Sequence, residues 1–275
     1  MEKAVIILTC YNRKEKTTTC IRSIAEENKK LDLQFVIVDD NSTDKTADAI
    51  RQMPVNAHIL TGTGGLFWNG GMHMGMQYAL EHVTDADYYV LINDDVNFYP
   101  GVLDKMAEKL GEDHDKRRVL VGATQADDGS LSYGGIRYQG RKSLKLRTIG
   151  PDEPEMECDT FNANCVMIPR DVFLKAGATD PHYSHSMGDF DYGFTIKRLG
   201  VKINVFEEYV GQCNDNPTEG TWQDRTLSIR RRLKLKEGKK GLPFKDWFRY
   251  LRKNFGLDVA VIRSVTPYLK IFLGR

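Results

Sequence analysis

Short apolar runs alternate with longer segments of helical period over roughly the first 125 residues of this chain. Because buried strands and the helices that cover them alternate in this way, the pattern predicts β-α units around a mostly parallel sheet. A continuous apolar run such as residues 4–8 is typical of a strand covered on both faces. The predicted strands are residues 4–8, 33–38, 58–60, 88–92 and 119–123, and the predicted helices are 14–28, a segment ending at 52, and 70–83.

The alternation stops in the second half of the chain. Residues 127–159 are rich in Gly, Tyr and alternating polar residues, which predicts hairpins and hence a small antiparallel addition to the sheet. A strand at 161–168 and a helix at 189–199, which Gly200 would end, are predicted after it.

Length and the distribution of charge indicate the domain organisation. A chain of 275 residues usually forms one large domain or a domain with an appendage. From about Trp222 the sequence mixes basic and aromatic residues at a helical period, unlike the acid-rich middle. We therefore predict an α/β catalytic domain at 1–220 and a helical C-terminal extension at 221–275.

Overall charge and cysteine usage exclude some classes of protein. Lys and Arg number 39 against 38 Asp and Glu, so the net charge of +1 gives the whole chain no attraction to nucleic acid. The five cysteines are scattered, without a CxxC pair or a histidine at zinc-ligand spacing, which indicates reduced thiols. The first apolar run is too short for a signal peptide or a membrane span. We therefore expect a cytoplasmic protein.

Two carboxylates follow the strand predicted at 88–92. Asp94 and Asp95 would face the crevice in which open α/β sheets bind ligands. Carboxylates suit Mg²⁺ or Mn²⁺ when substrate phosphates complete the coordination. The alternative for an isolated Asp pair is a solvated turn or a helix cap.

A second pair, Asp39 and Asp40, also comes directly after a predicted strand. Two parallel strands would therefore end in carboxylates on the same edge of the sheet. One pair could bind a base or ribose while the other holds the metal. Capping of the next helix by residues 41–44 is the alternative.

A third acidic cluster, Asp189 and Asp191, opens the helix predicted at 189–199. A carboxylate at this position could act as a general base if it lies within hydrogen-bond reach of a substrate hydroxyl. The alternative is that it caps the helix.

A glycine-rich stretch at 61–71 precedes a predicted helix, so its backbone amides could approach a phosphate. It has neither the Gly-Lys-Ser/Thr ending of a P-loop nor a GxGxxG pattern, which disfavours a nucleoside triphosphatase or a dinucleotide enzyme. The aromatic residues Phe67 and Trp68 within it could pack on a sugar or a base, or they could fill the core.

Taken together, these residues resemble the inverting family 2 glycosyltransferases of the GT-A fold, a Rossmann-like α/β fold. The opening strand ends in Thr-Cys-Tyr-Asn, Val-Asp-Asp-Asn-Ser follows the second strand, and Asn-Asp-Asp follows the fourth, in that family's order. The segment from Asp189 to Gly200 is similar to the family's acidic motif, which leads a helix that ends at glycine. The resemblance covers about the first 210 residues.

The resemblance implies a role for each candidate residue. Asp95 would hold the metal that bridges the donor diphosphate, and Asp189 would be the catalytic base, with Asp191 as the alternative because Gly188 stands where many relatives have Glu. The residues assigned to binding the nucleotide sugar are Thr9, Tyr11, Asn12, Asp39, Asp40, Gly65, Trp68, Asn69 and Asp94. A late histidine that completes the metal site in some relatives is missing from residues 210–215. His182 and His185 could touch the acceptor or the metal, and the alternative is that they are loop or packing residues.

The resemblance also implies the substrates. The donor would be a UDP- or dTDP-sugar, and the acceptor a glycan or a lipid-linked hydroxyl. The stretch Leu66 to Met72 is similar to rhamnosyl- or galactofuranosyltransferase-like members that act in bacterial polysaccharide assembly.

For the basic C-terminal extension two interpretations stay open. Phe244, Trp247, Phe248 and Leu251 fall on one helical face flanked by cations, so this face could contact the inner surface of the plasma membrane. It could equally pack on the catalytic domain or on a second copy in a homodimer.

Two rival functions remain at this stage. A nucleotidyltransferase that makes nucleotide sugars has a related sheet and metal site, but it usually carries a glycine-rich basic loop after its first strand, which this chain lacks. A non-catalytic nucleotide- or carbohydrate-binding module is the other, although it would have no need of three acidic clusters.

Overall fold

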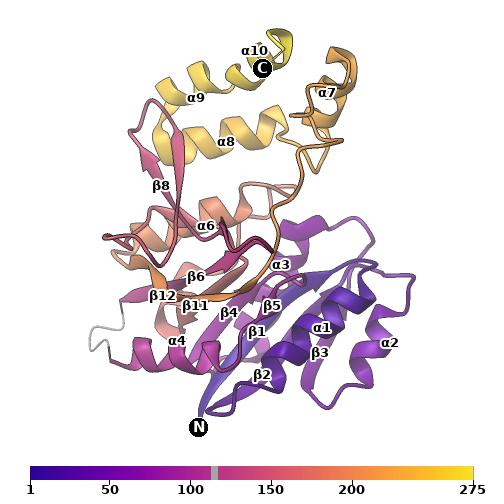
Figure 1. Cartoon of the computed structure of the whole chain (residues 1–275), viewed down its shortest axis with the longest axis vertical. Helices are drawn as coiled ribbons and strands as arrows, with labels where there is room; N and C mark the ends of the chain where they lie inside the picture. The colour runs from indigo at the N-terminus through magenta and orange to yellow at the C-terminus, as the bar shows by residue number, and fades with distance from the viewer. Residues whose placement is uncertain (113–116, 275) are drawn as a thin grey trace.

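The computed structural model describes residues 1–112 and 117–274, and one large curled sheet forms its centre (Figure 1). In spatial order its strands are β3 (Asn56–Thr61), β2 (Leu31–Asp39), β1 (Glu2–Cys10), β4 (Tyr88–Ile92), β11 (Cys165–Pro169), β6 (Arg118–Gln125), β12 (Lys202–Gln212) and β5 (Asn97–Phe98), with β7 (Leu131–Tyr133) beside β6. Strands β3, β2, β1 and β4 are parallel, whereas β11 is antiparallel to both β4 and β6. The predicted mostly parallel sheet is confirmed.

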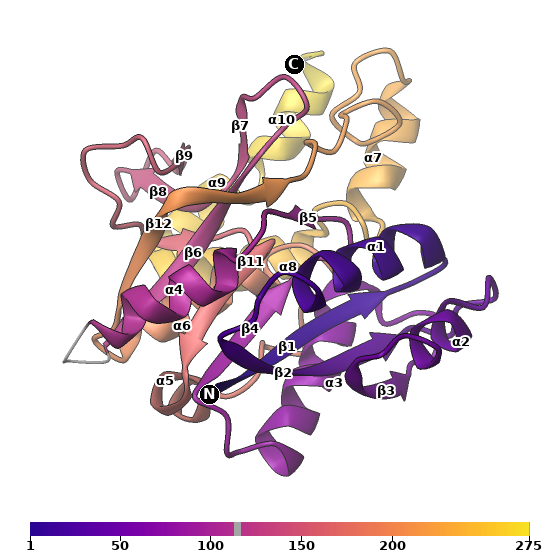
Figure 2. The same ribbon diagram turned by 60° about the horizontal axis from the view of Figure 1, so that its bottom comes forward.

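Helices cover both faces of this sheet. Successive side chains of β1 point to opposite faces, so Ile6 and Leu8 join one core while Val5 and Ile7 join the other. The helices on the first face are α1 (Lys14–Ala25), α2 (Thr46–Arg51) and α4 (Val102–Gly111), and those on the second are α3 (Phe67–His82), α5 (Arg170–Ala176) and α6 (Gly188–Arg198). Figure 2 shows α1 and α4 in front of the sheet. Burial on both faces explains why β1 is continuously apolar.

The predicted hairpins form a small antiparallel sheet. Its order is β10 (Thr160–Phe161), β8 (Gly135–Gln139) and β9 (Lys145–Ile149). The single strand predicted at 161–168 is wrong, because β10 belongs to the small sheet and β11 to the large one. Between them the Asn162 amide donates to the Gly134 carbonyl at 3.1 Å, and the Asn164 carbonyl accepts from the Asn93 amide at 3.3 Å. These contacts turn the chain from one sheet to the other.

Strand β5 and helices α4 and α5 were not predicted, and two further elements differ from the prediction for a physical reason. Strand β12 was not predicted, because Glu207 and Glu208 and the register irregularities between Val205 and Gly211 break its alternation. Helix α3 begins at Phe67, before the predicted start at 70, because its first amides bond to a carboxylate from another loop.

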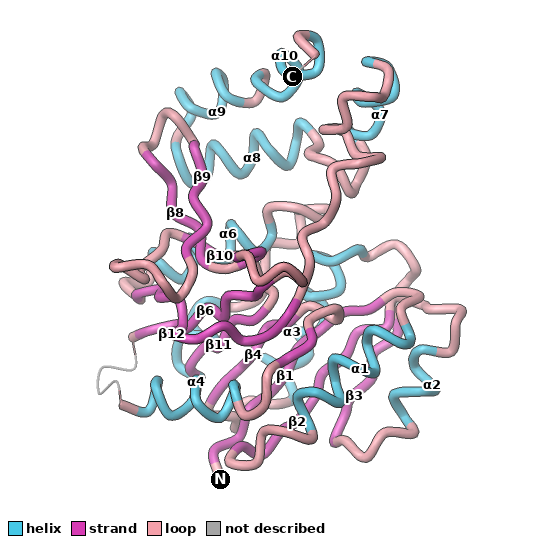
Figure 3. The backbone as a smooth tube through the Cα atoms, viewed as in Figure 1, coloured by secondary structure: helices cyan, strands magenta, loops and turns pink. Residues whose placement is uncertain are grey.

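The C-terminal extension is helical, as predicted. Its helices are α7 (Ile229–Glu237), α8 (Phe244–Phe255), α9 (Leu257–Arg263) and α10 (Thr266–Phe272). A third core joins α8 and α9 to β8 and α6, and the hydroxyls of Tyr138 and Tyr250 lie 2.7 Å apart. Figure 3 shows the β8–β9 hairpin beside α8 and α9. Within the described residues, no helix is long and apolar enough to cross a membrane.

Candidate active site

The three acidic clusters meet at one rim of the large sheet. Cys10 at the end of β1 pairs with Asp39 at the end of β2. On the other side, Ile92 at the end of β4 lies opposite Cys165, where the antiparallel β11 begins. Parallel strands end, and antiparallel strands begin, on the same side of a sheet. The loops that carry the first two acidic pairs therefore lie at one rim, and the Asp189 carboxylate reaches the same side through the Ala163 amide, two residues before β11 begins.

Asp94 and Asp95 are bridged by a guanidinium from the loop after β1. Arg13 Nη1 lies 3.1 Å from Asp94 Oδ1 and 3.0 Å from Asp95 Oδ2. The hydroxyl of Thr17 donates to Asp94 Oδ2 at 3.0 Å. Burial raises the pKa of Asp94, Arg13 opposes that rise, and the charge of Asp95 adds to it. The pair thus forms a concentrated negative charge that already holds one cation.

The two carboxylates supply oxygen ligands of the kind that Mg²⁺ or Mn²⁺ prefers, in a site that substrate phosphates would complete. Among the described residues, no group of three or more His, Cys, Asp or Glu side chains could hold a metal. Mg²⁺, however, is commonly bound by one or two carboxylates together with phosphates and water. Cys213 also lies beside the pair, with its Sγ 3.8 Å from Asp95 Oδ1. Both carboxylates bond to the Arg13 guanidinium, which shows that a positive charge fits between them.

The loops after β1 and β2 are joined by side chains of the predicted nucleotide pocket. Asn12 Oδ1 accepts the Thr43 amide at 2.7 Å, while the Asn12 amide donates to Ser42 Oγ at 2.9 Å. Asp39, which is 4% exposed, accepts the Ser42 amide at 2.9 Å. Tyr11 is half exposed beside them. Asn12 therefore fixes the loops, and Tyr11 presents an open ring.

Asp40 organises the glycine-rich stretch. Its carboxylate accepts the amides of Gly64 at 2.7 Å and Leu66 at 2.8 Å. A Cβ at Gly71 would lie 2.1 Å from Thr9 Oγ1, so this glycine lets α3 pack directly on β1. Backbone amides that were expected to approach a phosphate therefore donate to the Asp40 carboxylate instead. Gly65 lies at the edge of the loop.

The next residues link this loop to the Asp189 helix. Trp68 Nε1 donates to Asn93 Oδ1 at 2.7 Å, beside the Asp94–Asp95 pair. Asn69 is fully buried, and its Nδ2 donates to the Tyr183 carbonyl at 2.8 Å. A Cβ at Gly188 would lie 2.0 Å from Asn69 Oδ1. Asn69 therefore occupies the space in which a side chain at 188 would stand.

Asp189 and Asp191 have different surroundings. Asp189 is partly exposed, and burial raises the pKa of its carboxyl to about 6. The backbone amides of Phe190 and Ala163 donate to this carboxylate and partly oppose that rise in pKa. Asp191 is 1% exposed and pairs with Lys253 Nζ at 2.5 Å. In the described part of the chain the first carboxylate accepts only backbone amides, whereas the second anchors α8 to α6.

The two histidines before α6 lie in its preceding loop. His185 Nδ1 accepts the Trp68 amide at 3.3 Å, and desolvation lowers the pKa of His185 to about 4. His182 Nδ1 lies 2.9 Å from Asp180 Oδ1. Neither contacts the Asp94–Asp95 pair through any bond in the described part of the chain.

Two basic residues at the site were not singled out from the sequence. Arg13 follows the Tyr-Asn of the first strand, and its position at a strand end was a usable signal. Lys239 Nζ lies 3.4 Å from the Gly65 carbonyl and 5.0 Å from the centre of the Phe67 ring. No local pattern could have shown that contact, because Gly65 and Lys239 are 174 residues apart.

Comparison with known proteins shows the family of this chain. A model of glycosyl transferase family 2 matches residues 5–175, which is more than half of the chain. The chain belongs to glycosyl transferase family 2. The matched segment contains the first two acidic clusters of this transferase and ends before Asp189. No curated protein matches the sequence.

Solved structures of glycosyltransferases share the fold. TarS from S. aureus (residues 1–349) is 16% identical, with a TM-score of 0.59 over 98% of this chain and 81% of that one. The mannosyltransferase PcManGT from Pyrobaculum calidifontis, in complex with GDP-Man and Mn²⁺, is 17% identical, with a TM-score of 0.57 over 98% of this chain and 74% of that one. GalNAc-T7 with UDP, GalNAc and Mn²⁺ is 11% identical, with a TM-score of 0.55 over 95% of this chain and 56% of that one.

Proposed function

We propose that this protein is an inverting, metal-dependent glycosyltransferase that moves a sugar from a UDP- or dTDP-sugar to a hydroxyl of a glycan or lipid-linked acceptor in bacterial polysaccharide assembly. The observation that carries the proposal is the convergence of three acidic clusters on one rim of the sheet. Its support includes the family match, and solved relatives that hold UDP-GlcNAc or GDP-Man with Mn²⁺.

Asp189 is the proposed base. Its pKa of about 6 keeps most of the carboxylate ionised at about pH 7, yet close enough to that pH for efficient proton transfer. Asp191 already neutralises Lys253, so it is less available to accept a proton. The acceptor oxygen would lose its proton to Asp189 as it attacks the anomeric carbon from the side opposite the nucleotide. A single displacement of this kind inverts the configuration and needs no covalent enzyme intermediate.

The donor would lie between the first two acidic clusters. Asp39, Thr9 and Tyr11 are proposed to line the nucleotide pocket, with Asp39 accepting from the base. Asp40, Asn12 and Asn69 would shape that pocket through the bonds that hold its loops. Gly65 and Trp68 would border the donor at the start of α3.

Asp95, with Asp94 beside it, would hold Mg²⁺ or Mn²⁺ next to the donor diphosphate. The ion, when bound, offsets the negative charge that develops on the departing nucleoside diphosphate. Thr17 and the buried end of β4 keep Asp94 in place at this position.

The same proposal places the protein at the inner face of the plasma membrane. The face predicted for this contact is not free, because Leu251 is buried and Trp247 and Phe248 pack against the third core. The large apolar side chains that are exposed lie instead on and beside α9 and α10: Leu257, Val261, Ile262, Val265, Leu269, Phe272 and Leu273. The basic residues Arg263 and Lys270 lie on the same two helices. An apolar face with cations around it is suited to an anionic lipid surface.

A screen of nucleotide sugars for metal-dependent hydrolysis of the donor tests the function. Production of nucleoside diphosphate supports the transferase, whereas pyrophosphate would indicate a nucleotidyltransferase. Nucleotide binding without metal dependence or turnover would indicate a binding module.

Variants then test the assigned roles. We expect Asp95→Asn to lose metal-dependent hydrolysis, and Asp189→Asn to lose transfer by about 100-fold or more while still binding donor. Asp48→Asn, in an exposed pair with Arg51 on α2, is the matched control and should keep full activity. Full activity of either site variant would refute its assignment.

A further inference from the structure

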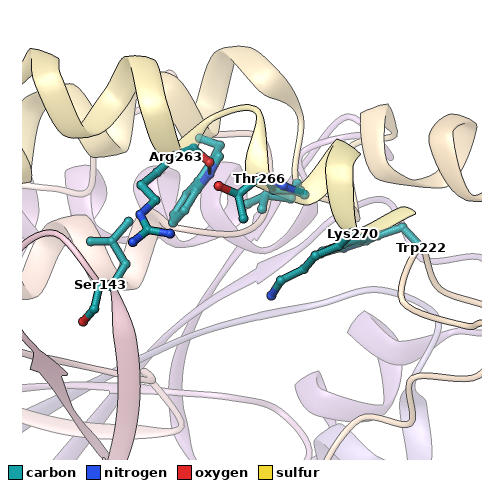
Figure 4. A pocket seen from close by; sticks show the side chains of 9 residues that line it. Ser143, Trp222, Arg263, Thr266 and Lys270 are labelled. Carbon is teal, nitrogen blue, oxygen red and sulfur yellow. Dashed lines mark hydrogen bonds between the residues drawn. The ribbon is translucent and has the colours of Figure 1, made fainter. Parts of the chain in front are cut away.

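A basic groove opens beside the proposed base, between the β8–β9 hairpin and the C-terminal helices. One cavity of about 240 Å³ lies between Ser143 at the hairpin turn and Lys270 of α10, as Figure 4 shows. A second, of about 390 Å³, shares Trp222 and Trp247 with it and extends to Phe190. Asp189 itself does not line the cavity, but Phe190 directly follows it, so the groove lies next to the helical turn that carries the proposed base.

Cations line this groove and no carboxylate does. Arg263 and Lys270 line the first cavity, Lys240 lines the second, and neither lining contains Asp or Glu. A third cavity of about 310 Å³ shares Trp222 and Lys270 with the first and adds Arg225 and Arg232, again without an acidic residue. Within the described residues, no ion pair joins Lys240, Arg263 or Lys270 to a carboxylate.

The cations are close to aromatic surface. Trp222 and Trp247 are half buried and take part in the wall of both the first and the second cavity. In Figure 4 the cationic ends of Arg263 and Lys270 reach into the space between Ser143 and Trp222. Indole faces pack on sugar rings or apolar chains, whereas Lys and Arg without partners attract anions.

The donor does not account for these charges. Its diphosphate would lie at Asp95 on the sheet rim, whereas this groove lies on the Phe190 side of Asp189 and extends over the extension. The remaining substrate is the acceptor. We propose that the groove binds an acceptor that carries phosphate near its glycosyl end, with the sugar between the aromatic residues and the phosphate among Lys240, Arg263 and Lys270.

This inference rests on the proposed function and specifies its acceptor. The phosphate could belong to a lipid-linked acceptor or to a phosphorylated glycan, because the groove recognises the same anion in both. An apolar tail would continue over α9 and α10, whereas a glycan would end within the cavities.

Calorimetry on the full chain with three probes tests the groove: octyl phosphate, glycerol phosphate and the neutral octyl glucoside. We expect octyl phosphate to bind about tenfold or more tightly than octyl glucoside, because the phosphate pairs with cations that have no carboxylate partner among the described residues, although Arg263 Nε also donates to the Lys142 carbonyl at 2.7 Å. Tighter binding of octyl phosphate than of glycerol phosphate indicates the lipid-linked source, and equal binding indicates the phosphorylated glycan. Equal binding of the two octyl compounds, or no binding of either phosphate, overturns the inference.

Charge reversal locates the bound phosphate. Lys270→Glu removes an exposed cation from the first and third cavities, and Lys240→Glu removes one from the second; each should weaken octyl phosphate binding about tenfold. Lys245→Glu, an exposed α8 cation outside the cavities, should change it less than about twofold. An equal effect of all three variants would overturn the inference. Donor hydrolysis by the unaltered chain is measured separately, so its absence would refute the proposed function without affecting the phosphate result.

Discussion

Arg13 holds both carboxylates at the position proposed for the metal. Its guanidinium, 46% exposed, must move or share these oxygens when a divalent ion binds. We therefore expect Arg13→Gln to bind Mn²⁺ in the presence of UDP about tenfold more tightly than the unaltered chain, because it removes a competing cation. Calorimetric titration of Mn²⁺ at about pH 7.5 measures this, a pH well above the usual range of carboxyl groups.

Arg22→Gln is the control for that titration, since Arg22 is an exposed α1 residue whose carboxylate partner is Glu26. It should leave the affinity for Mn²⁺ unchanged. Weaker Mn²⁺ binding by Arg13→Gln would mean that Arg13 supports the metal site instead of competing for it.

The environment of Asp189 predicts a pH dependence. The carboxyl must be ionised to accept a proton, and burial raises its pKa to about 6. Activity should therefore fall as the pH drops through about 6, by about tenfold per pH unit below it, and should level off above about 7. Measurement of kcat/KM against pH at saturating Mn²⁺ gives the profile. UDP affinity over the same range separates loss of the base from loss of the donor site, and a flat profile between about pH 5 and 8 would contradict the role of Asp189.

Among the single residues, the sequence could predict those whose position in a strand or helix is locally encoded. Asp39 directly follows a buried apolar run and Asp95 comes three residues after another, so their place at the sheet rim followed from the pattern. The partners of Arg13 could not be predicted in this way, because Asp94 is 81 residues away and only the β1–β4 pairing brings them together. The different surroundings of Asp189 and Asp191 likewise could not be predicted, because they depend on Lys253 of the extension, which pairs with Asp191.

At the scale of elements, the contact between α3 and α6 sets the position of the proposed base. Gly188→Ala should place a Cβ where Asn69 Oδ1 now lies, 2.0 Å away, and so lower the free energy of unfolding by about 1–3 kcal/mol. Urea unfolding measures this change. Gly111→Ala, at the end of α4 where an added Cβ meets nothing within 4 Å, is the matched control and should be neutral or slightly stabilising.

A double variant tests whether Asn69 causes that loss. Asn69→Ala removes the colliding amide but leaves the Asp180 and Tyr183 carbonyls without its hydrogen bonds. We expect Gly188→Ala to cost less in the Asn69→Ala background than alone, a coupling of about 1 kcal/mol. Strictly additive changes would show that the two positions do not compete for space.

Two elements differ from the prediction because their boundaries depend on distant contacts, whereas the unpredicted helix α4 has a local helical pattern that was not assigned. Helix α3 starts at Phe67 because the carboxylate of Asp40 accepts the amides before it, and no capping residue in the local sequence marks that start. Strand β12 is held by pairing with β6 in spite of its irregular pattern. By contrast, β1, β2 and β4 are buried on both faces, so their apolar runs sufficed.

For the whole molecule, charge divides between the catalytic part and the extension. Residues 221–275 contain fifteen Lys and Arg and four Asp and Glu, a net charge of +11, whereas residues 1–220 contain 24 and 34, a net charge of −10. Helices α9 and α10, which carry the exposed apolar set, lie at the end of the molecule opposite the N-terminus (Figure 1). On an anionic bilayer, the proposed membrane contact would keep the basic extension next to the lipid and the acidic rim of the sheet away from it.

Vesicle binding of the full chain tests this orientation. We expect binding to phosphatidylglycerol vesicles that weakens with salt and is nearly absent with phosphatidylcholine, because the cations attract only an anionic surface. Ile262→Asp together with Phe272→Asp should weaken binding about tenfold or more, since these side chains are 65% and 59% exposed and would enter the lipid. Leu174→Asp on α5, 38% exposed, is the control and should bind normally. If the double variant instead turns a dimer into a monomer in sedimentation without changing vesicle binding, the apolar face holds a second copy of the chain, and the membrane contact is refuted.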